Sequence, residues 1–190
     1  MKACLRTLLL VVFLAFAPAS AKQESWYLNI GAGWSNLTYP SDVQTTLDFI
    51  KSQPGVDNLA IQFDLGVYGP INKVTAFGAS VNASRDRYEW SGDWFQVIEY
   101  QYGFSALRYF GEEIGHGFFV RGDLGLVATF CQNPGGTLDN LHIGASILAG
   151  GGYSWRITPG TRLYLGGNYA YRRFKGRSTG AVKIGPGFQF

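Results

Sequence analysis

The chain has 190 residues, of which 46% are hydrophobic and 16% aromatic, and it contains 26 glycines. Its formal net charge is +3, but Lys2 and Arg6 belong to an N-terminal segment whose removal leaves 14 basic against 13 acidic residues. This balance argues against nucleic acid as a partner, and the lack of a second apolar run of 18 residues excludes a helical membrane protein.

The N-terminal segment has the three parts of a secretory signal peptide. Lys2 and Arg6 form its basic region, residues 8–17 are mostly apolar, and residues 19–21 are the small side chains typical of a cleavage site. The apolar stretch is too short for a membrane anchor, which needs about 20 residues. We therefore expect a signal peptide at residues 1–21 and export of the remaining chain.

Residues 22–190 are predicted to form one all-β domain. Hydrophobic side chains alternate with polar or small ones, which is the pattern of strands with one apolar face. In the first strand, Leu28 and Ile30 share one face and Asn29 lies on the other. Eight such strands are predicted, at residues 25–36, 59–69, 74–84, 94–109, 118–130, 141–154, 162–174 and 181–190.

The last predicted strand is typical of a strand that closes a membrane barrel. Apolar side chains occupy every second position up to Phe188 and Phe190, so one face can contact lipid and the final aromatic can lie at the membrane interface. Pro186 removes one hydrogen bond from the ladder, and we expect a local bulge there. Phe188 and Phe190 are the predicted assembly signal.

The connections alternate in length and polarity. Short turns are predicted at residues 70–73, 111–117 and 156–161, and mostly longer or more polar connections at 37–58, 85–93, 131–140 and 175–179. Short periplasmic turns and longer outer loops are typical of outer-membrane barrels.

The first outer connection contains residues 41–53, with two open interpretations. Ser41 and Gln44 have capping-box spacing, and Val43, Leu47 and Ile50 would share one helical face. The segment is therefore either a short helix over the barrel mouth or a loop whose periodicity arises by chance.

Aromatic residues gather near the ends of the predicted strands. An indole ring has a large apolar body and one N–H donor, so it is favoured where hydrocarbon meets water. We predict an inner belt and an outer belt, formed respectively by Trp26 and Trp155 and by Trp34, Trp90 and Trp94. Tyrosine and phenylalanine join them at Tyr109, Tyr153, Phe188 and Phe190 on the inner side and at Tyr88, Phe130, Tyr169 and Tyr171 on the outer side.

Periodicity alone leaves the direction of the apolar face open. A soluble lipocalin-type barrel also has eight alternating strands, and residues 31–34, Gly-Ala-Gly-Trp, superficially match the Gly-x-Trp feature of its first strand. The aromatic closing strand, the two belts and the lack of a helical segment after the last strand favour an outward apolar face.

With that orientation, the barrel interior receives a set of charged residues and amides. The charged residues are Asp64, Glu99, Arg121, Asp123, Arg172 and Lys183, and the amides are Asn29, Gln62, Asn82, Gln101 and Asn168. Two interpretations are an ion pathway and a structural plug. An eight-stranded barrel is only wide enough for its own side chains, which favours a plug of paired charges.

The signal segment, eight strands, aromatic belts and terminal Phe together resemble the OmpA/OmpX type of small outer-membrane barrel. The resemblance covers the whole of residues 22–190, and its markers are architectural. It implies an eight-stranded antiparallel transmembrane β-barrel with an up-and-down meander, resident in the outer membrane and assembled through recognition of the C-terminal strand. Members of this group are anchors, adhesins, small channels or lipid-modifying enzymes.

Catalytic chemistry has little support. A lipid A deacylase would need a serine, a histidine base and an acid in contact. His116 is predicted in an inner turn, while His142 and Ser146 are four residues apart on one strand, about 13 Å. Asp139 is close to His142 only in sequence, and Cys131 alone remains after signal removal. We expect no enzyme activity, no cofactor, no metal site and no internal disulfide.

The predicted protein is therefore a monomeric outer-membrane barrel with a structural, adhesion or envelope-integrity role through its surface loops. A small-solute channel is the second hypothesis and lipid A modification the third. The expected partners are outer-membrane lipid, lipopolysaccharide, the outer-membrane assembly machinery and an extracellular ligand at the loops. Anionic lipopolysaccharide would be attracted to basic residues at the outer strand ends, where ordinary solvation is an equal alternative: Arg85, Arg87, Arg172, Arg173, Lys175 and Arg177.

Overall fold

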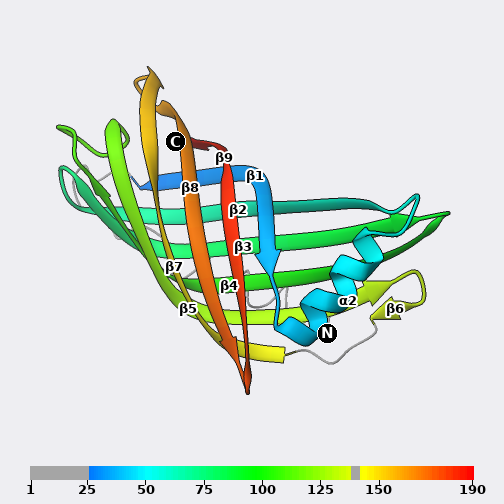
Figure 1. Ribbon diagram of the computed structural model, residues 1–190. Coiled ribbons are helices and arrows are strands. Elements are labelled where there is room, and N and C mark those ends of the chain that lie inside the picture. The colour runs from blue at the N-terminus through cyan, green and yellow to red at the C-terminus, as the bar shows by residue number, and fades with distance from the viewer. Residues whose placement is uncertain (1–25, 138–141) are drawn as a thin grey trace.

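The computed structural model describes residues 26–137 and 142–190, which form a closed antiparallel β-barrel (Figure 1). The predicted signal peptide at residues 1–21 lies outside the described residues, as does Asp139. The elements in chain order are β1 (Tyr27–Thr38), α2 (Ser41–Lys51), β2 (Asp57–Asn72), β3 (Thr75–Trp90), β4 (Asp93–Tyr109), β5 (Gly117–Asn133), β6 (Gly136–Thr137), β7 (His142–Thr158), β8 (Thr161–Phe174) and β9 (Arg177–Gln189).

Eight long strands follow one another around the barrel, and the two-residue β6 only extends the β5 hairpin. Each strand pairs with its neighbours in sequence, and β1 closes the ring by pairing with β9. The predicted eight-stranded up-and-down barrel is therefore confirmed. Within the described residues, no helix has the length and apolar character needed to cross a membrane.

The prediction of a loop at residues 85–93 is wrong, because β3 and β4 continue through most of this segment. They pair from Arg85–Ile98 out to Trp90–Asp93, and Ser91 and Gly92 alone form the turn. Both turn residues have positive φ, 46° and 88°, as expected of a two-residue hairpin turn. Polar side chains occupy both faces here, so an apolar alternation could not mark the strand.

The bulge expected at Pro186 is also absent from the described seam between β1 and β9. The pairs Gly31–Gly187 and Trp34–Ile184 flank the proline and keep the same register. Register shifts occur instead at residues 70–72 in β2 and 156–158 in β7. Pro186 therefore removes a hydrogen bond from the ladder, but it does not insert the extra residue that a bulge requires.

The segment at residues 41–53 contains a helix, so the helical alternative is confirmed. Figure 1 shows α2 at the outer end of the barrel, between the end of β1 and the projecting ends of β2 to β5. Its apolar face, which includes Leu47, packs on inward-facing strand residues such as Tyr88 and Val97. The capping box is wrong: Pro40 is the N-cap, and the Gln44 side-chain oxygen accepts a hydrogen bond from the Tyr39 backbone at 3.1 Å.

Candidate functional site: the barrel interior and its two ends

The side chains of the barrel wall divide by polarity. Phe104, Leu124 and Ile184 point outward and are 68%, 66% and 61% exposed, whereas Glu99 and Arg172 point inward and are fully buried. This arrangement reverses that of a soluble barrel, which would bury its large apolar residues. The candidate functional site is therefore centred on the buried charges of the interior.

The first buried group of charges is centred on Asp123 of β5. Arg121 donates two hydrogen bonds to its carboxylate, Nε–Oδ1 at 2.9 Å and Nη2–Oδ2 at 2.5 Å. Ser80 and Ser105 donate to the same carboxylate at 2.9 and 2.6 Å. Asn82 donates as well, at 3.3 Å. A carboxylate with this many donors is well compensated for its loss of water.

Asp64 joins this group to the opposite wall. Its carboxylate accepts a hydrogen bond from Lys183 of β9 and lies 3.9 Å from Arg121 Nη1. Because β2, β5 and β9 all contribute, the ion pairs cross the interior rather than follow one strand.

The second buried group lies closer to the outer end. Glu99 of β4 and Arg172 of β8 form an ion pair in which both side chains are fully buried. Thr179 and Thr129 donate to Glu99 at 3.0 and 3.3 Å, and Arg172 also donates to Ser84 at 2.9 Å. The expectation that Arg172 belongs to an exposed basic cluster is therefore wrong.

The structure thus brings all six predicted charges into two groups of paired charges. Of the five predicted amides, Asn29, Gln62, Asn82 and Gln101 are buried and Asn168 is half-buried, and each faces inward.

Sequence reasoning missed an apolar plug at the inner end. Ile114 comes from the loop between β4 and β5, is 2% exposed and packs with Tyr68, Leu107 and Phe119. Its backbone N–H donates to the Lys73 carbonyl of the neighbouring turn at 2.8 Å. A single isoleucine in a loop of glycines and charges has no periodicity, so no sequence pattern could reveal its role.

The outer end is closed by α2 and a buried hydrogen-bond cluster beneath it. Asp86 accepts from Tyr39 at 3.0 Å, from Tyr88 at 2.8 Å and from Asn58 at 2.7 Å. Burial, and the negative charge of Asp86 beside it, raise the pKa of the Tyr39 hydroxyl well above its usual value. Tyr39 therefore stays protonated and keeps donating.

Two aromatics assigned to the outer belt and one assigned to the inner belt lie elsewhere. Tyr88 and Tyr109 are buried inside the barrel, and Trp90 packs against the core beneath α2. Trp94, at the tip of the β3–β4 hairpin, lies under Arg87, with the guanidinium carbon 4.9 Å from the ring centroid. The remaining three belt tryptophans, Trp26, Trp34 and Trp155, are exposed.

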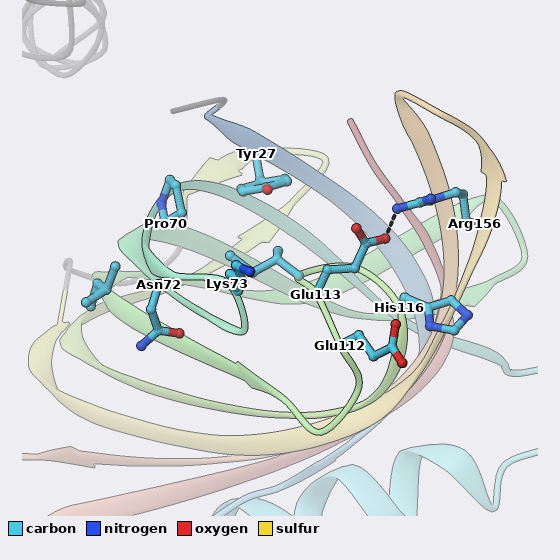
Figure 2. A pocket seen from close by; sticks show the side chains of 10 residues that line it. Tyr27, Pro70, Asn72, Lys73, Glu112, Glu113, His116 and Arg156 are labelled. Atoms are coloured by element: carbon cyan, nitrogen blue, oxygen red, sulfur yellow. Dashed lines mark ion pairs between the residues drawn. The ribbon is translucent and has the colours of Figure 1, made fainter. Parts of the chain in front are cut away.

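The two histidines lie at opposite ends of the barrel, His142 at the outer start of β7 and His116 in the inner loop. A hollow of about 950 Å³ lies at the inner end, and His116, Glu113 and Arg156 are among the residues that line it. Figure 2 shows Glu113 pointing toward Arg156, with which it forms an ion pair. Among the described residues, no group of three or more His, Cys, Asp or Glu side chains is placed to hold a metal ion.

The closed ring of eight antiparallel strands, with apolar side chains outside and ion pairs inside, defines the small outer-membrane barrel fold. Ail, the attachment invasion locus protein of Yersinia pestis, has this fold. In complex with the heparin analogue sucrose octasulfate, it matches with a TM-score of 0.59 and 15% identity over 88% of this chain and 99% of that chain.

Ail solved by itself matches with a TM-score of 0.55 and 14% identity over 88% of this chain and 100% of that chain. Neisserial surface protein A matches with a TM-score of 0.56 and 16% identity over 88% of this chain and 98% of that chain. At these identities the likeness establishes the fold, and the resemblance to small outer-membrane barrels is confirmed at that level. No protein-family model matches the sequence, and the comparison with curated proteins gives no match.

Proposed function

We propose that the protein is a monomeric outer-membrane barrel that does not conduct solutes and that acts at the cell surface, in attachment or in envelope integrity. The observation that carries this proposal is the succession of three closed layers in the interior. The layers are the Ile114 plug, the central ion pairs and the cluster beneath α2. Export by the signal peptide at 1–21 and assembly through Phe188 and Phe190 are part of the same proposal.

The closed layers argue against passage along the barrel axis. An ion that entered would have to give up water at the Ile114 plug and again at the packed side chains beneath α2, and an unpaired charge in such a place costs several kcal/mol or more. The central charges are already paired with one another, so they offer an ion little compensation. The channel hypothesis is therefore the weaker one.

The outer end has the chemistry to bind an anionic surface. Arg173, Lys175 and Arg177 lie in or beside the β8–β9 turn and are exposed or half-exposed, as are Arg85 and Arg87 of β3. Clustered cations attract polyanions over roughly a Debye length, about 8 Å at physiological salt. Ail, which shares the fold, was solved with a polysulfated heparin analogue, and we propose lipopolysaccharide phosphates or a sulfated glycan as partners of this end.

We also propose that the chain has no catalytic activity. The described histidines lie at opposite ends of the barrel, and His142 and Ser146 occupy one strand four residues apart, about 13 Å. A hydrogen-bonded pair of base and nucleophile needs a separation near 3 Å. Mass spectrometry of lipid A from expressing cells should therefore show unchanged acyl chains, and a lost chain would refute this part.

The test of the closed interior is single-channel recording of the purified protein in planar bilayers. We expect no stable unitary conductance, and a stable conductance from the folded protein would overturn the proposal. The attachment role is tested with bacteria on heparin-coated surfaces. A triple Arg173→Gln, Lys175→Gln, Arg177→Gln variant should lose binding, whereas Arg108→Gln at the inner end should retain it. Equal binding by both variants would refute attachment through this end.

A further inference from the structure

A second cavity, of about 330 Å³, lies at the outer end beneath α2 and to one side of the barrel. The helix contributes Val43 and Leu47, and β4 contributes Phe95 and Val97 to the opposite wall. Phe174, at the outer end of β8, completes the mainly apolar lining. Its volume is near the lower end of the range for small-molecule sites, about 300–1,000 Å³. The cavity therefore has room for one slender apolar group.

The polar side chain at the floor of this cavity already has its partners. Glu99 lines the cavity, but Arg172 pairs with one of its oxygens and Thr179 and Thr129 donate to the other. Two of these donors are neutral hydroxyls and the third is a fixed guanidinium. Glu99 therefore needs no charged group from a ligand. The part of the cavity beside it can hold a hydrocarbon chain.

The rim of the cavity is positively charged. Lys175 and Arg177, from the turn between β8 and β9, both line it and both are exposed. Arg177 forms an ion pair with Asp42 of α2 at 3.1 Å, and both of these side chains are solvated, so the pair is weak. Lys175 leaves a surplus of positive charge at this rim, and the exposed Arg173 lies two residues before it in the chain.

The rim also lies beside the membrane-facing band of the barrel wall. Tyr169 and Tyr171 point outward just below the turn and are 51% and 40% exposed. Tyrosine at such a position is typical of the boundary between hydrocarbon and water. The head group of an amphiphile in the outer leaflet lies at this boundary, which is close to the level of the cationic rim.

We propose that this cavity binds a single-chain anionic amphiphile, with the alkyl chain against Val43, Leu47 and Phe95 and the anionic head beside Lys175 and Arg177. The small volume restricts the site to one chain. A free fatty acid and one acyl chain of an anionic membrane lipid share this chemistry. The site goes beyond surface attachment, because it does not depend on a macromolecular partner.

The test uses the folded barrel in phosphatidylcholine nanodiscs with radiolabelled dodecanoate as the probe, and empty nanodiscs give the background. We expect saturable binding of one dodecanoate per barrel, and saturable protection of Cys131, which lines the cavity, from alkylation by a maleimide. Dodecyltrimethylammonium, with the same chain and a positive head, should bind more weakly. Equal binding of both amphiphiles, or none above background, would overturn the proposal.

Two variants locate the ligand. Val43→Trp fills the cavity and should abolish saturable binding, while heat-modifiable migration on a denaturing gel confirms that the variant is folded. Lys175→Gln with Arg177→Gln should weaken dodecanoate binding about fivefold at low salt, from two exposed charges, and this difference should vanish at 1 M salt. Arg108→Gln is the matched control at the inner end. Unchanged binding in folded Val43→Trp would place the ligand elsewhere and refute the site.

A final arm separates the two sources of the ligand. In nanodiscs that contain lipopolysaccharide, Cys131 should already be protected without dodecanoate if a membrane lipid supplies the chain. If Cys131 is protected only after dodecanoate is added, a free fatty acid is the ligand. Either result supports the site, whereas protection in neither condition refutes it.

Discussion

The ion pair between Glu99 and Arg172 allows a direct measurement of what the interior charges contribute. Both side chains are fully buried, and they connect β4 with β8, which β5 and β7 separate in the barrel wall. We consider Glu99→Gln, Arg172→Met and the double variant. Each single change leaves one ion without its charged partner, whereas the double change removes both charges together.

The magnitudes follow from burial. Removing one member of a buried ion pair costs about 3–5 kcal/mol, because the remaining charge stays out of water without its partner. Glu99 keeps the hydroxyls of Thr129 and Thr179 after the loss of Arg172, and Arg172 keeps Ser84 after the loss of Glu99. We therefore expect each single variant to lose about 3 kcal/mol, at the low end of that range. The double variant should lose less than either single one.

The assay is reversible urea unfolding of the barrel in lipid vesicles, followed by tryptophan fluorescence. The free energy of unfolding of the wild type and the three variants gives a double-mutant cycle, whose coupling energy should exceed about 2 kcal/mol. Single losses that simply add, within about 0.5 kcal/mol, would show that the pair is not coupled. Additive losses would also refute the idea that the interior charges stabilise one another.

Three further predictions concern packing, closure and protonation. Leu47→Ala should lower the free energy of unfolding by about 2–4 kcal/mol by leaving a hole beneath α2, whereas Phe49→Ala on the exposed face of the helix should change it by less than about 0.5 kcal/mol. A side chain on Gly185 would collide with the backbone of β1, so Gly185→Val should abolish heat-modifiable migration, while Gly122→Ala, with open space around it, should retain it. Tyr39→Phe should cost about 1.5–3 kcal/mol in urea unfolding, because a hydrogen bond to a buried carboxylate is lost. Since the folded-state pKa of Tyr39 is raised above the unfolded value of about 10, this difference should be constant from pH 7 to 9 and decline as the pH rises above about 10 toward the folded-state pKa.

The barrel could be predicted because one rule applies along nearly the whole chain. Each strand has lipid on one side and a packed interior on the other, so apolar and polar or small residues alternate along it. The number and order of the strands follow from this alternation. The rule fails where the barrel projects beyond the membrane. At residues 85–90 both faces meet water or other side chains, and β3 continues there without an apolar face.

The two ends of the interior depend on contacts that no local pattern records. Ile114 acts as a plug only because the inner loop folds back over Phe119. The cavity beneath α2 has walls from Val43, Val97 and Phe174, which are far apart in sequence. By contrast, the central ion pairs could be predicted in part, since strand periodicity places all six charges inside. The identity of each ion pair depends on the register and shear of the strands. Neither can be read from the sequence.

Those ion pairs also offer a physical reason for the single register of the barrel. Lys183 of β9 reaches Asp64 of β2 across the seam between β1 and β9, so this pair forms only when the ring is closed. A slip of one residue in β9 would turn Lys183 toward lipid and bring Ile184 inside. A lysine at the middle of the lipid face costs about 2–4 kcal/mol, and Asp64 would lose its partner in the interior as well. The same charges therefore penalise every odd misregistration of the closing strand.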